Sequence, residues 1–405
     1  MLLESASPYR NCFQHLSFEP PVSPGFALMN RFTLFVSSAL LCCLVWNSSS
    51  VYGQRERAKT APNVKDPRVG RRVIITVAGA ELRTPKETVW KGYVGEVFTV
   101  SLTNGEWLWI NEKGGWLWEK ETAPFDTAVG IFTQRVNEQK SAENYHLRGV
   151  AYLAHQQYEK AAADFTESLR QEPRNVGALN NRGQVSYLNG NFQSAIQDFT
   201  SAIAIEAKNP LVLNNRALAY IALGDDDNAL KDLRTALNLV PQYPEALNNR
   251  GVVHQKLKML DEAVADFTEA LKIYPQYIDA LENRASAYVE QKDHAKAIAD
   301  LESAMKFSPN SYEAANDLAW LLATAPDDAV RNKERALTLA KQACAITEYK
   351  QWNTLDTLAV AFAANGQFAE AKTWLGTAML LAPEEEKVQL QAHLDLVMAE
   401  KPVRD

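Results

Sequence analysis

Apolar and small positions recur every 34 residues through the middle of the chain. From residue 142 to residue 311 this spacing holds over five consecutive units without a gap. A small residue recurs in the first half of each unit, at Gly149, Gly183, Ala217, Gly251 and Ala285. An aromatic residue or leucine recurs in the second half, at Phe165, Phe199, Leu233, Phe267 and Leu301. A fixed period of this length indicates stacked supersecondary units that bury their apolar faces against one another.

Further landmarks keep the same register. An alanine follows the first small residue by twelve positions, at Ala161, Ala195, Ala229, Ala263 and Ala297, and a proline closes four units, at Pro173, Pro241, Pro275 and Pro309. This pattern resembles the tetratricopeptide repeat (TPR). The resemblance implies antiparallel helix pairs that stack into a superhelix, and a role in binding proteins or peptides.

The repeat pattern continues less regularly towards the C-terminus. Residues 312–351 predict an irregular repeat with an insertion at residues 325–328, and residues 352–385 predict a further repeat. Residues 386–405 predict a capping helix and a tail, since a solenoid needs its last apolar face covered. Residues 320–371 resemble the tail of exported TPR proteins from planctomycete-type bacteria.

A segment ahead of the repeats has a different texture. Residues 73–124 are rich in β-branched and aromatic residues, and Asn104-Gly105 between two strand-like runs is typical of a β-hairpin turn. The run GYVGEVFTVSLTNGEWLWINEKGGWLWEK resembles the bacterial SH3-like fold. The predicted fold class is therefore mainly α: a TPR helical-hairpin superhelix preceded by a small all-β SH3-like barrel, with residues 125–141 as the connecting segment.

The β segment concentrates the tryptophans of the chain. Five of nine lie there, at Trp90, Trp107, Trp109, Trp116 and Trp118. A barrel this small cannot bury five indoles fully. The resemblance implies an aromatic surface that binds a peptide or a cell-wall polymer. The alternative is that the rings form the core and rim of a structural module.

The N-terminal 53 residues read as an export signal. Residues 32–46 are apolar and uncharged, Arg31 precedes them, and small and polar residues follow up to Gly53. We expect cleavage after Gly53 and a mature protein in the periplasm or cell envelope; the alternative is an uncleaved membrane anchor. Because a signal starts near a chain's N-terminus, Met29 is the expected start, and residues 1–28 a non-native extension.

Charge divides the rest of the chain. Residues 54–72 hold seven basic and two acidic residues, a net charge of +5, and predict a flexible basic linker that is either a solvated spacer or a contact for anionic lipid or polymer. The whole chain of 405 residues is 46% hydrophobic, 22% charged and carries −7, so residues 73–405 carry −12. This balance argues against a nucleic-acid partner.

Two charged positions also repeat. An arginine precedes each small residue (Arg148, Arg182, Arg216, Arg250, Arg284), and an aspartate precedes each aromatic or leucine position (Asp164, Asp198, Asp232, Asp266, Asp300). Opposite charges on neighbouring helices predict a structural Arg–Asp ladder.

An asparagine column is the main candidate binding site. Asn181, Asn215, Asn249 and Asn283 lie two residues before the small position, and Asn180, Asn214 and Asn248 precede three of them. The slot matches the asparagine ladder of TPR arrays related to glycosyltransferase superhelices. An amide both donates to and accepts from a peptide backbone, so a row of them could hold an extended chain. The alternative is that the amides bridge adjacent repeats.

The sequence offers no catalytic or metal motif. None of HExxH, GxSxG, GxxxxGK[ST] or GxGxxG after a strand is present. Cys344 alone remains after the predicted cleavage and lies in an apolar helical pattern, which indicates a buried small hydrophobe. We therefore predict no enzyme, no metal and no cofactor. The predicted function is an exported protein-interaction scaffold, and the alternative is a cell-envelope protein whose SH3-like domain binds a wall polymer.

Overall fold

The computed structural model describes residues 66–77, 80–91, 95–111 and 114–404. The predicted signal, its cleavage site and most of the basic linker lie outside the described residues. The described residues form two compact units, 66–246 and 247–404, and each is treated by itself below.

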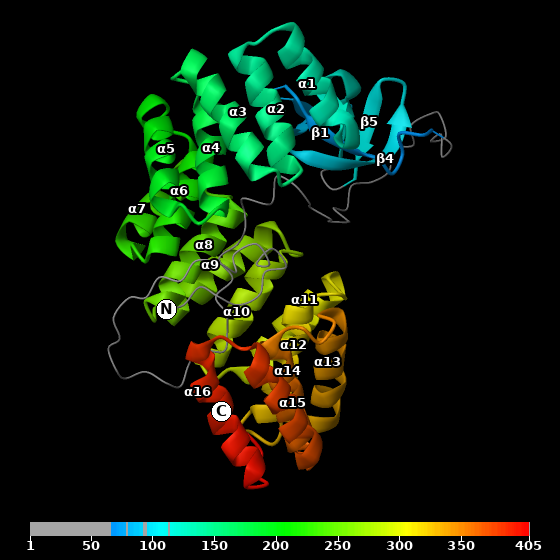
Figure 1. Cartoon of the computed structure of the whole chain (residues 1–405), viewed down its shortest axis with the longest axis vertical. Helices are drawn as coiled ribbons and strands as arrows, with labels where there is room; N and C mark the ends of the chain where they lie inside the picture. Colours follow the sequence, from blue (N-terminus) through cyan, green and yellow to red (C-terminus); the bar gives the residue numbers. More distant parts are fainter. Residues whose placement is uncertain (1–65, 78–79, 92–94, 112–113, 405) are drawn as a thin grey trace. The chain divides into compact units, whose positions relative to one another are not determined.

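The first unit opens with a small antiparallel sheet of order β3-β2-β6-β5-β4-β1-β7 (Figure 1). Its strands are β1 Arg72–Ile75, β2 Glu81–Arg83, β3 Thr88–Lys91, β4 Val97–Asn104, β5 Trp107–Ile110, β6 Gly115–Trp118 and β7 Thr122–Pro124. The 3-10 turns η2 Glu119–Glu121 and η3 Phe125–Thr127 flank β7.

Helical hairpins make up the rest of the chain. The first unit continues with α1 Ala128–Glu138, α2 Ala142–Ala154, α3 Tyr158–Gln171, α4 Val176–Leu188, α5 Phe192–Ile205, α6 Pro210–Leu223 and α7 Asp226–Leu239. Helix α8 Pro244–Lys256 lies at the boundary. The second unit holds α9 Leu260–Ile273, α10 Ile278–Glu290, α11 His294–Phe307, α12 Tyr312–Thr324, α13 Lys333–Ile346, α14 Trp352–Ala364, α15 Phe368–Leu381 and α16 Glu384–Met398. The predicted fold class, mainly α with helical hairpins after a small all-β part, is confirmed.

Close packing at the small residue defines each hairpin. Phe165, Phe199 and Phe267 are fully buried, and each lies over the glycine of its own repeat. A Cβ added to Gly251 would lie 2.6 Å from Cε1 of Phe267. Glycine therefore occurs where the partner is phenylalanine, and alanine occurs where the partner is the smaller leucine. This exchange is visible in the sequence, but only the structure explains it.

The hairpin turn of the sheet differs from the prediction by one residue. The turn residues are Gly105, with φ of 61°, and Glu106, while Asn104 ends β4 and pairs with Trp107. A one-residue change of register reverses the face of every side chain. The observed register puts Leu108, Ile110 and Leu117 into the core of the sheet.

The segment expected to be a connection contains a helix and joins the sheet to the first repeat. Phe125, Ala128 and Phe132, from η3 and α1, share one buried cluster with Ile74 of β1 and Val150 of α2. Contact is close, because a Cβ on Gly95 would lie 2.7 Å from Cγ1 of Val150. The sheet and the first repeat therefore have a common core.

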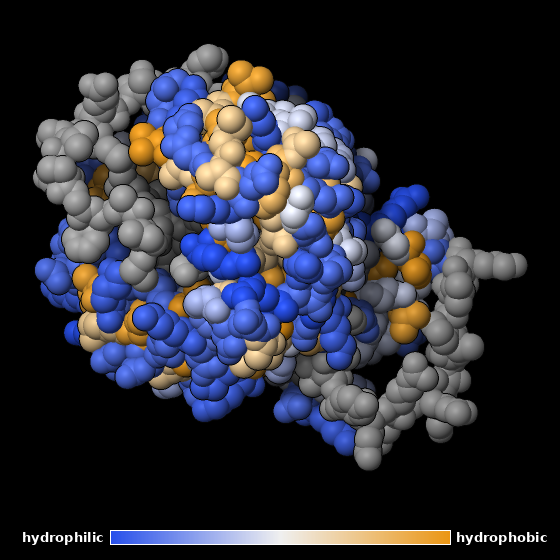
Figure 2. All heavy atoms as spheres, turned by 90° about the horizontal axis from the view of Figure 1, so that it is seen from below, coloured by the Kyte–Doolittle hydropathy of each residue, from blue (hydrophilic) through white to orange (hydrophobic). Residues whose placement is uncertain are grey.

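The last helix covers the array only in part. Buried Leu390 and Val397 of α16 face the core, whereas Leu380 of α15 is 85% exposed and Val388 of α16 is 79% exposed. Seen from below, the surface shows apolar residues scattered among a majority of hydrophilic ones (Figure 2).

The contact between glycine and phenylalanine can be tested by exchange. Gly251→Ala should lower the unfolding midpoint by the equivalent of about 1–3 kcal/mol, because the new methyl group overpacks against Phe267. Adding Phe267→Leu, the combination natural to the third and fifth repeats, should recover most of the loss. Urea denaturation followed by circular dichroism measures both. Gly376→Ala is the matched control: nothing lies within 4 Å of its Cβ, so it should be neutral or stabilising. Equal losses in both alanine variants would contradict the packing account.

Candidate functional site

The predicted asparagine column lies on the first helices of successive repeats. Asn180 and Asn181 belong to α4, Asn214 and Asn215 to α6, Asn248 and Asn249 to α8, and Asn283 to α10. Asn181 is partly exposed, and the other six are buried. The 34-residue period places these amides at equivalent positions of neighbouring hairpins.

Several of these amides bridge adjacent repeats, as the alternative interpretation expects. Asn215 Nδ2 donates to Asn180 Oδ1 at 2.9 Å, and Asn283 Nδ2 donates to Asn248 Oδ1 at 3.1 Å. Each bridge occupies one donor and one acceptor of amides that have two N–H groups and two lone pairs. The role of the column in binding a peptide stays a prediction.

The first repeat takes part through a histidine. Asn181 Nδ2 lies 3.1 Å from Nε2 of His146, and Asn180 Nδ2 donates to Asn181 Oδ1 at 3.2 Å. Burial lowers the pKa of His146 to about 4, so its ring is neutral at pH 7. Since an amide nitrogen only donates, Nε2 of His146 is the acceptor. The column therefore starts in the first repeat, where the sequence has leucine at the asparagine position.

One amide in the column has an unused donor. Asn248 is fully buried, and its Nδ2 makes no hydrogen bond within the described part of the chain. A buried donor without an acceptor is destabilising by about 1–3 kcal/mol.

The column becomes acidic beyond the fourth repeat. Glu282 of α10 takes the place of the first asparagine, and one period later α12 has Asn316 and Asp317. Ser311 Oγ donates to Glu282 Oε1 at 3.0 Å. Glu313 lies 34 residues after Asp279, on the preceding turn of the same helices. The sequence analysis missed these carboxylates because it ended the column with the last regular repeat; extending the period past residue 311 finds them.

Burial and mutual repulsion shift these carboxylates. Burial raises the pKa of Glu282 well above its usual range, and the charges of Glu313, Asp279 and Asp317 add to the rise. Burial likewise raises the pKa of Glu313 to about 7 and that of Asp317 to about 7. The cluster therefore gains negative charge as the pH rises through 7.

The predicted Arg–Asp pairing is confirmed in all five regular repeats. In each pair Nε and Nη2 of the arginine donate to the two carboxylate oxygens, as at 2.7 and 2.8 Å between Arg216 and Asp232. Three of the arginines also reach the preceding repeat, as Arg216 Nη1 donates to Thr200 Oγ1 at 3.0 Å. The five bidentate pairs are Arg148–Asp164, Arg182–Asp198, Arg216–Asp232, Arg250–Asp266 and Arg284–Asp300. They fix hairpin geometry and repeat register.

The tryptophans of the sheet lie in two cross-strand pairs. Trp107 pairs with Trp118 and Trp109 with Trp116 across β5 and β6, on the face opposite to the core. The rings of Trp109 and Trp116 meet edge to face, with centroids 5.2 Å apart. Trp107 is 38% exposed and the other three are half-buried. Trp90 pairs with Leu82 through its backbone, and its side chain lies outside the description.

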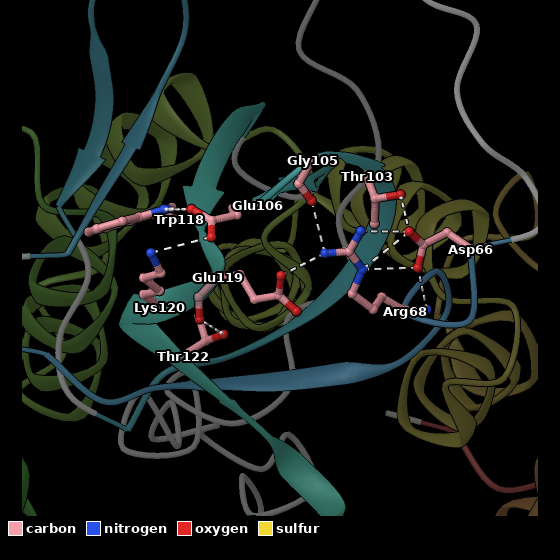
Figure 3. A network of polar contacts seen from close by, with 9 residues as sticks. All are labelled: Asp66, Arg68, Thr103, Gly105, Glu106, Trp118, Glu119, Lys120 and Thr122. Carbon is pink, nitrogen blue, oxygen red and sulfur yellow. Dashed lines mark hydrogen bonds and ion pairs between the residues drawn. The ribbon is translucent and has the colours of Figure 1, made fainter.

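A polar network edges this aromatic face (Figure 3). The guanidinium of Arg68 binds Asp66 through Nε and Nη2, Glu119 through Nη1 at 2.6 Å, and the carbonyl of Gly105. Trp118 Nε1 donates to Glu106 Oε2 at 3.3 Å. Arg68 holds the pKa of Asp66 well below its usual range through these hydrogen bonds. Residues 66–72, expected to be the end of a flexible linker, are therefore fixed to the sheet.

The cysteine thiol and the potential metal ligands of the described residues show no arrangement for catalysis or metal binding. Cys344 is fully buried, its Sγ donates to the carbonyl of Thr354 at 3.2 Å, and burial raises its pKa to about 11. The predicted small hydrophobe is confirmed. Within the described ranges no group of three or more His, Cys, Asp or Glu side chains is arranged to hold a metal ion. The helices of the described part include none long and apolar enough to cross a membrane.

The geometry defines a helical-hairpin repeat protein. Family profiles described as tetratricopeptide repeat match residues 146–210, 244–277 and 278–311, and one described as TPR repeat matches residues 218–258. The chain therefore contains tetratricopeptide repeats.

A solved structure with a TM-score above 0.5 agrees on the fold. The crystal structure of the APC/C hetero-tetramer Cut9-Hcn1 is similar with a TM-score of 0.51 at 20% identity, over 58% of this chain and 46% of that chain. A tetratricopeptide repeat protein from Parabacteroides merdae matches with a TM-score of 0.45 at 21% identity, over 64% and 99% of the two chains. YrrB, described as a TPR protein with an unusual peptide-binding site, matches with a TM-score of 0.38 at 23% identity, over 46% and 97%. This chain thus spans less than half of the Cut9-Hcn1 chain that it matches. No curated protein sequence matched.

The acidic cluster makes stability depend on pH. Because the pKa of Asp317 is about 7 in the folded chain and near 4 when unfolded, the folded state binds more protons between these values, and stability falls as the pH rises through them. Asp317→Asn keeps the neutral form. It should raise stability by about 1–3 kcal/mol at pH 8 and change it little at pH 4. Asp395→Asn, which removes an exposed charge from α16, is the control and should show no such difference. Thermal melts at the two pH values decide the outcome, and an unchanged melting temperature at pH 8 would contradict the account.

Proposed function

We propose that this protein is an exported, non-catalytic scaffold that binds an extended segment of a partner protein along the first-helix, concave face of its TPR repeats. The TPR fold supports an interaction scaffold in general terms. The observation that carries the specific proposal is the column of amides at equivalent positions of α4, α6, α8 and α10. Export rests on the signal-like pattern of residues 1–53.

Backbone recognition follows from the chemistry of the amide. Asparagine donates to a peptide carbonyl and accepts from a peptide N–H, so the contact does not depend on the partner's side chains. The inter-repeat bridges hold Asn215 and Asn283 in place and leave part of their bonding capacity. Asn181 is the partly exposed member of the column.

The acidic end of the column adds a preference for charge. Burial is the main cause of the raised pKa values of Glu282, Glu313 and Asp317, and repulsion from neighbouring carboxylates adds to it. A lysine or arginine of the partner would relieve this repulsion and favour the ionised carboxylates. The proposed partner segment is therefore extended and carries positive charge where it meets α10 and α12.

Synthetic peptides provide the test. A fluorescent ten-residue peptide of alternating lysine and serine should bind the full chain, and the glutamate–serine peptide should not. Affinity for the lysine peptide should be about tenfold higher at pH 8 than at pH 5.5, because Glu313 and Asp317 are ionised at the higher pH. Fluorescence anisotropy at constant ionic strength measures both. Equal affinity for the two peptides would contradict the charge preference.

Variants separate the amides from the general fold. Replacing Asn181, Asn215, Asn249 and Asn283 together by alanine should weaken binding of the lysine peptide more than tenfold while the helical circular dichroism signal remains. Some loss of thermal stability is expected, because the contacts of Asn181 with His146, of Asn215 with Asn180 and of Asn283 with Asn248 disappear. The control replaces exposed Gln193 and Gln197 of α5 by alanine and should bind like the native chain. Native-like binding by the fourfold variant would remove the amide column from the proposal.

The aromatic face of the sheet favours a second candidate. Four indoles lie on the solvent side of β5 and β6. The resemblance to bacterial SH3-like domains suggests a cell-wall polymer as their partner. In this alternative the SH3-like part attaches the protein to the envelope and the repeats act as a spacer. Trp107→Ala should then reduce co-sedimentation of the full chain with purified cell wall several-fold. Leu257→Ala, at an exposed apolar residue of the second unit, should not. Sedimentation that is the same for both variants would exclude the aromatic face as the attachment.

A further inference from the structure

The second unit contains a pocket at the irregular sixth repeat and the C-terminal tail, where the chain departs from the 34-residue period. It has a volume of about 390 Å³ and lies between the ends of α12 and α14, the start of α13, and the C-terminal segment that follows α16. Its polar lining consists of Arg331, Asn332, Lys333, Glu334 and Arg404. Arg331 lies in the loop between α12 and α13, just after the insertion of the sixth repeat, and Arg404 lies in the tail; neither segment has a counterpart in the regular repeats.

Backbone contacts hold both arginines at the pocket. Arg331 Nη1 donates to the carbonyls of Ala325 at 2.7 Å and Pro326 at 2.9 Å, and its Nη2 pairs with Asp328. Arg404 Nη1 donates to the carbonyl of Ala323 at 3.0 Å, next to buried Val403. The guanidinium groups are therefore positioned by the fold.

Positive charge at this pocket is only partly compensated. Within the described residues no carboxylate forms an ion pair with Arg404 or Lys333. Burial and the neighbouring charge of Arg331 lower the pKa of Arg404. Glu334 is the acidic side chain of the lining. The nearby helix end adds little, because Asn332 Oδ1 already accepts from the N–H of Arg335.

We propose that this pocket binds the phosphate group of a small phosphorylated molecule. Arg404 can donate through Nε and Nη2, and Lys333 can donate through its ammonium group. These donors come from two separate segments, and the oxygens of a tetrahedral phosphate can accept hydrogen bonds from both. The volume is at the lower end of the range for ligand pockets, about 300–1,000 Å³, and leaves room for more than a bare ion. Glu334 then lies where a hydroxyl group of the ligand could donate to it. This site is separate from the asparagine column and does not depend on the proposed peptide binding.

Calorimetric titration of the full chain tests the site. Glycerol phosphate, inorganic phosphate and acetate are titrated separately at constant ionic strength. Saturable binding of glycerol phosphate, or of inorganic phosphate alone, supports the proposal and distinguishes an organic phosphate from the free ion. Acetate that binds as tightly as both phosphates, or no saturable binding of any phosphate, overturns it.

Single-charge variants locate the binding. Arg404→Gln and Lys333→Gln should each weaken phosphate binding at least tenfold. Because Arg404 also anchors the tail, Lys333→Gln, whose ammonium group makes no hydrogen bond within the described residues, keeps the test valid if the first variant is destabilised. Arg335→Gln removes the same charge two residues further along α13, where Arg335 pairs with Glu302, and is the matched control. Native-like affinity in Lys333→Gln, or an equal loss in Arg335→Gln, overturns the assignment.

Discussion

Contact between the two helices of each hairpin is the constraint on which the rest of the repeat architecture depends. In three repeats a phenylalanine ring packs so closely on a glycine that a single methyl group would collide with it. That contact sets the distance and rotation of the two helices, because ring and backbone have no space for adjustment. In such a repeat Arg250 and Asp266 meet in a bidentate pair, and the repeats with alanine and leucine at the contact have the same pair, as between Arg216 and Asp232.

Within each compact unit, successive hairpins stack in the same way, so residues 34 positions apart form columns. The amide column is the clearest case, since Asn180 and Asn215 meet only because two successive repeats are in register. Departures from the period carry the differences in chemistry. The column changes from amide to carboxylate at Glu282 and Asp317, and burial raises the pKa of Glu282 well above its usual range and that of Asp317 to about 7. The insertion before α13 brings Arg331 to a pocket that a regular repeat would lack.

The sheet is part of the same mechanical unit as the first repeats. Ile74 and Val150 lie in one buried cluster, and helix α1 fills the space between sheet and repeat. The aromatic face of β5 and β6 and the start of the amide column therefore belong to one compact unit. A partner bound to the aromatic face is therefore bound to the same compact unit as a partner bound to the start of the amide column.

Much of this molecule was determined by the sequence alone. The hairpins were predicted from the 34-residue period, the small residues and the Arg–Asp columns. This was possible because the same local contact in each repeat requires the same residue type at the same position. The sequence also predicted the asparagine column, and hydrogen bonds between adjacent repeats were one of the two roles it suggested for these amides. Tertiary structure alone decided the rest. The turn at Gly105 and Glu106 depends on which face of β5 is buried, and the helix at residues 128–138 is stable through its packing between sheet and repeat. The pocket around Arg331 and Arg404 joins segments about seventy residues apart that share no period. Each of these tertiary contacts occurs only once in the described structure, so no repeating pattern in the sequence predicts it.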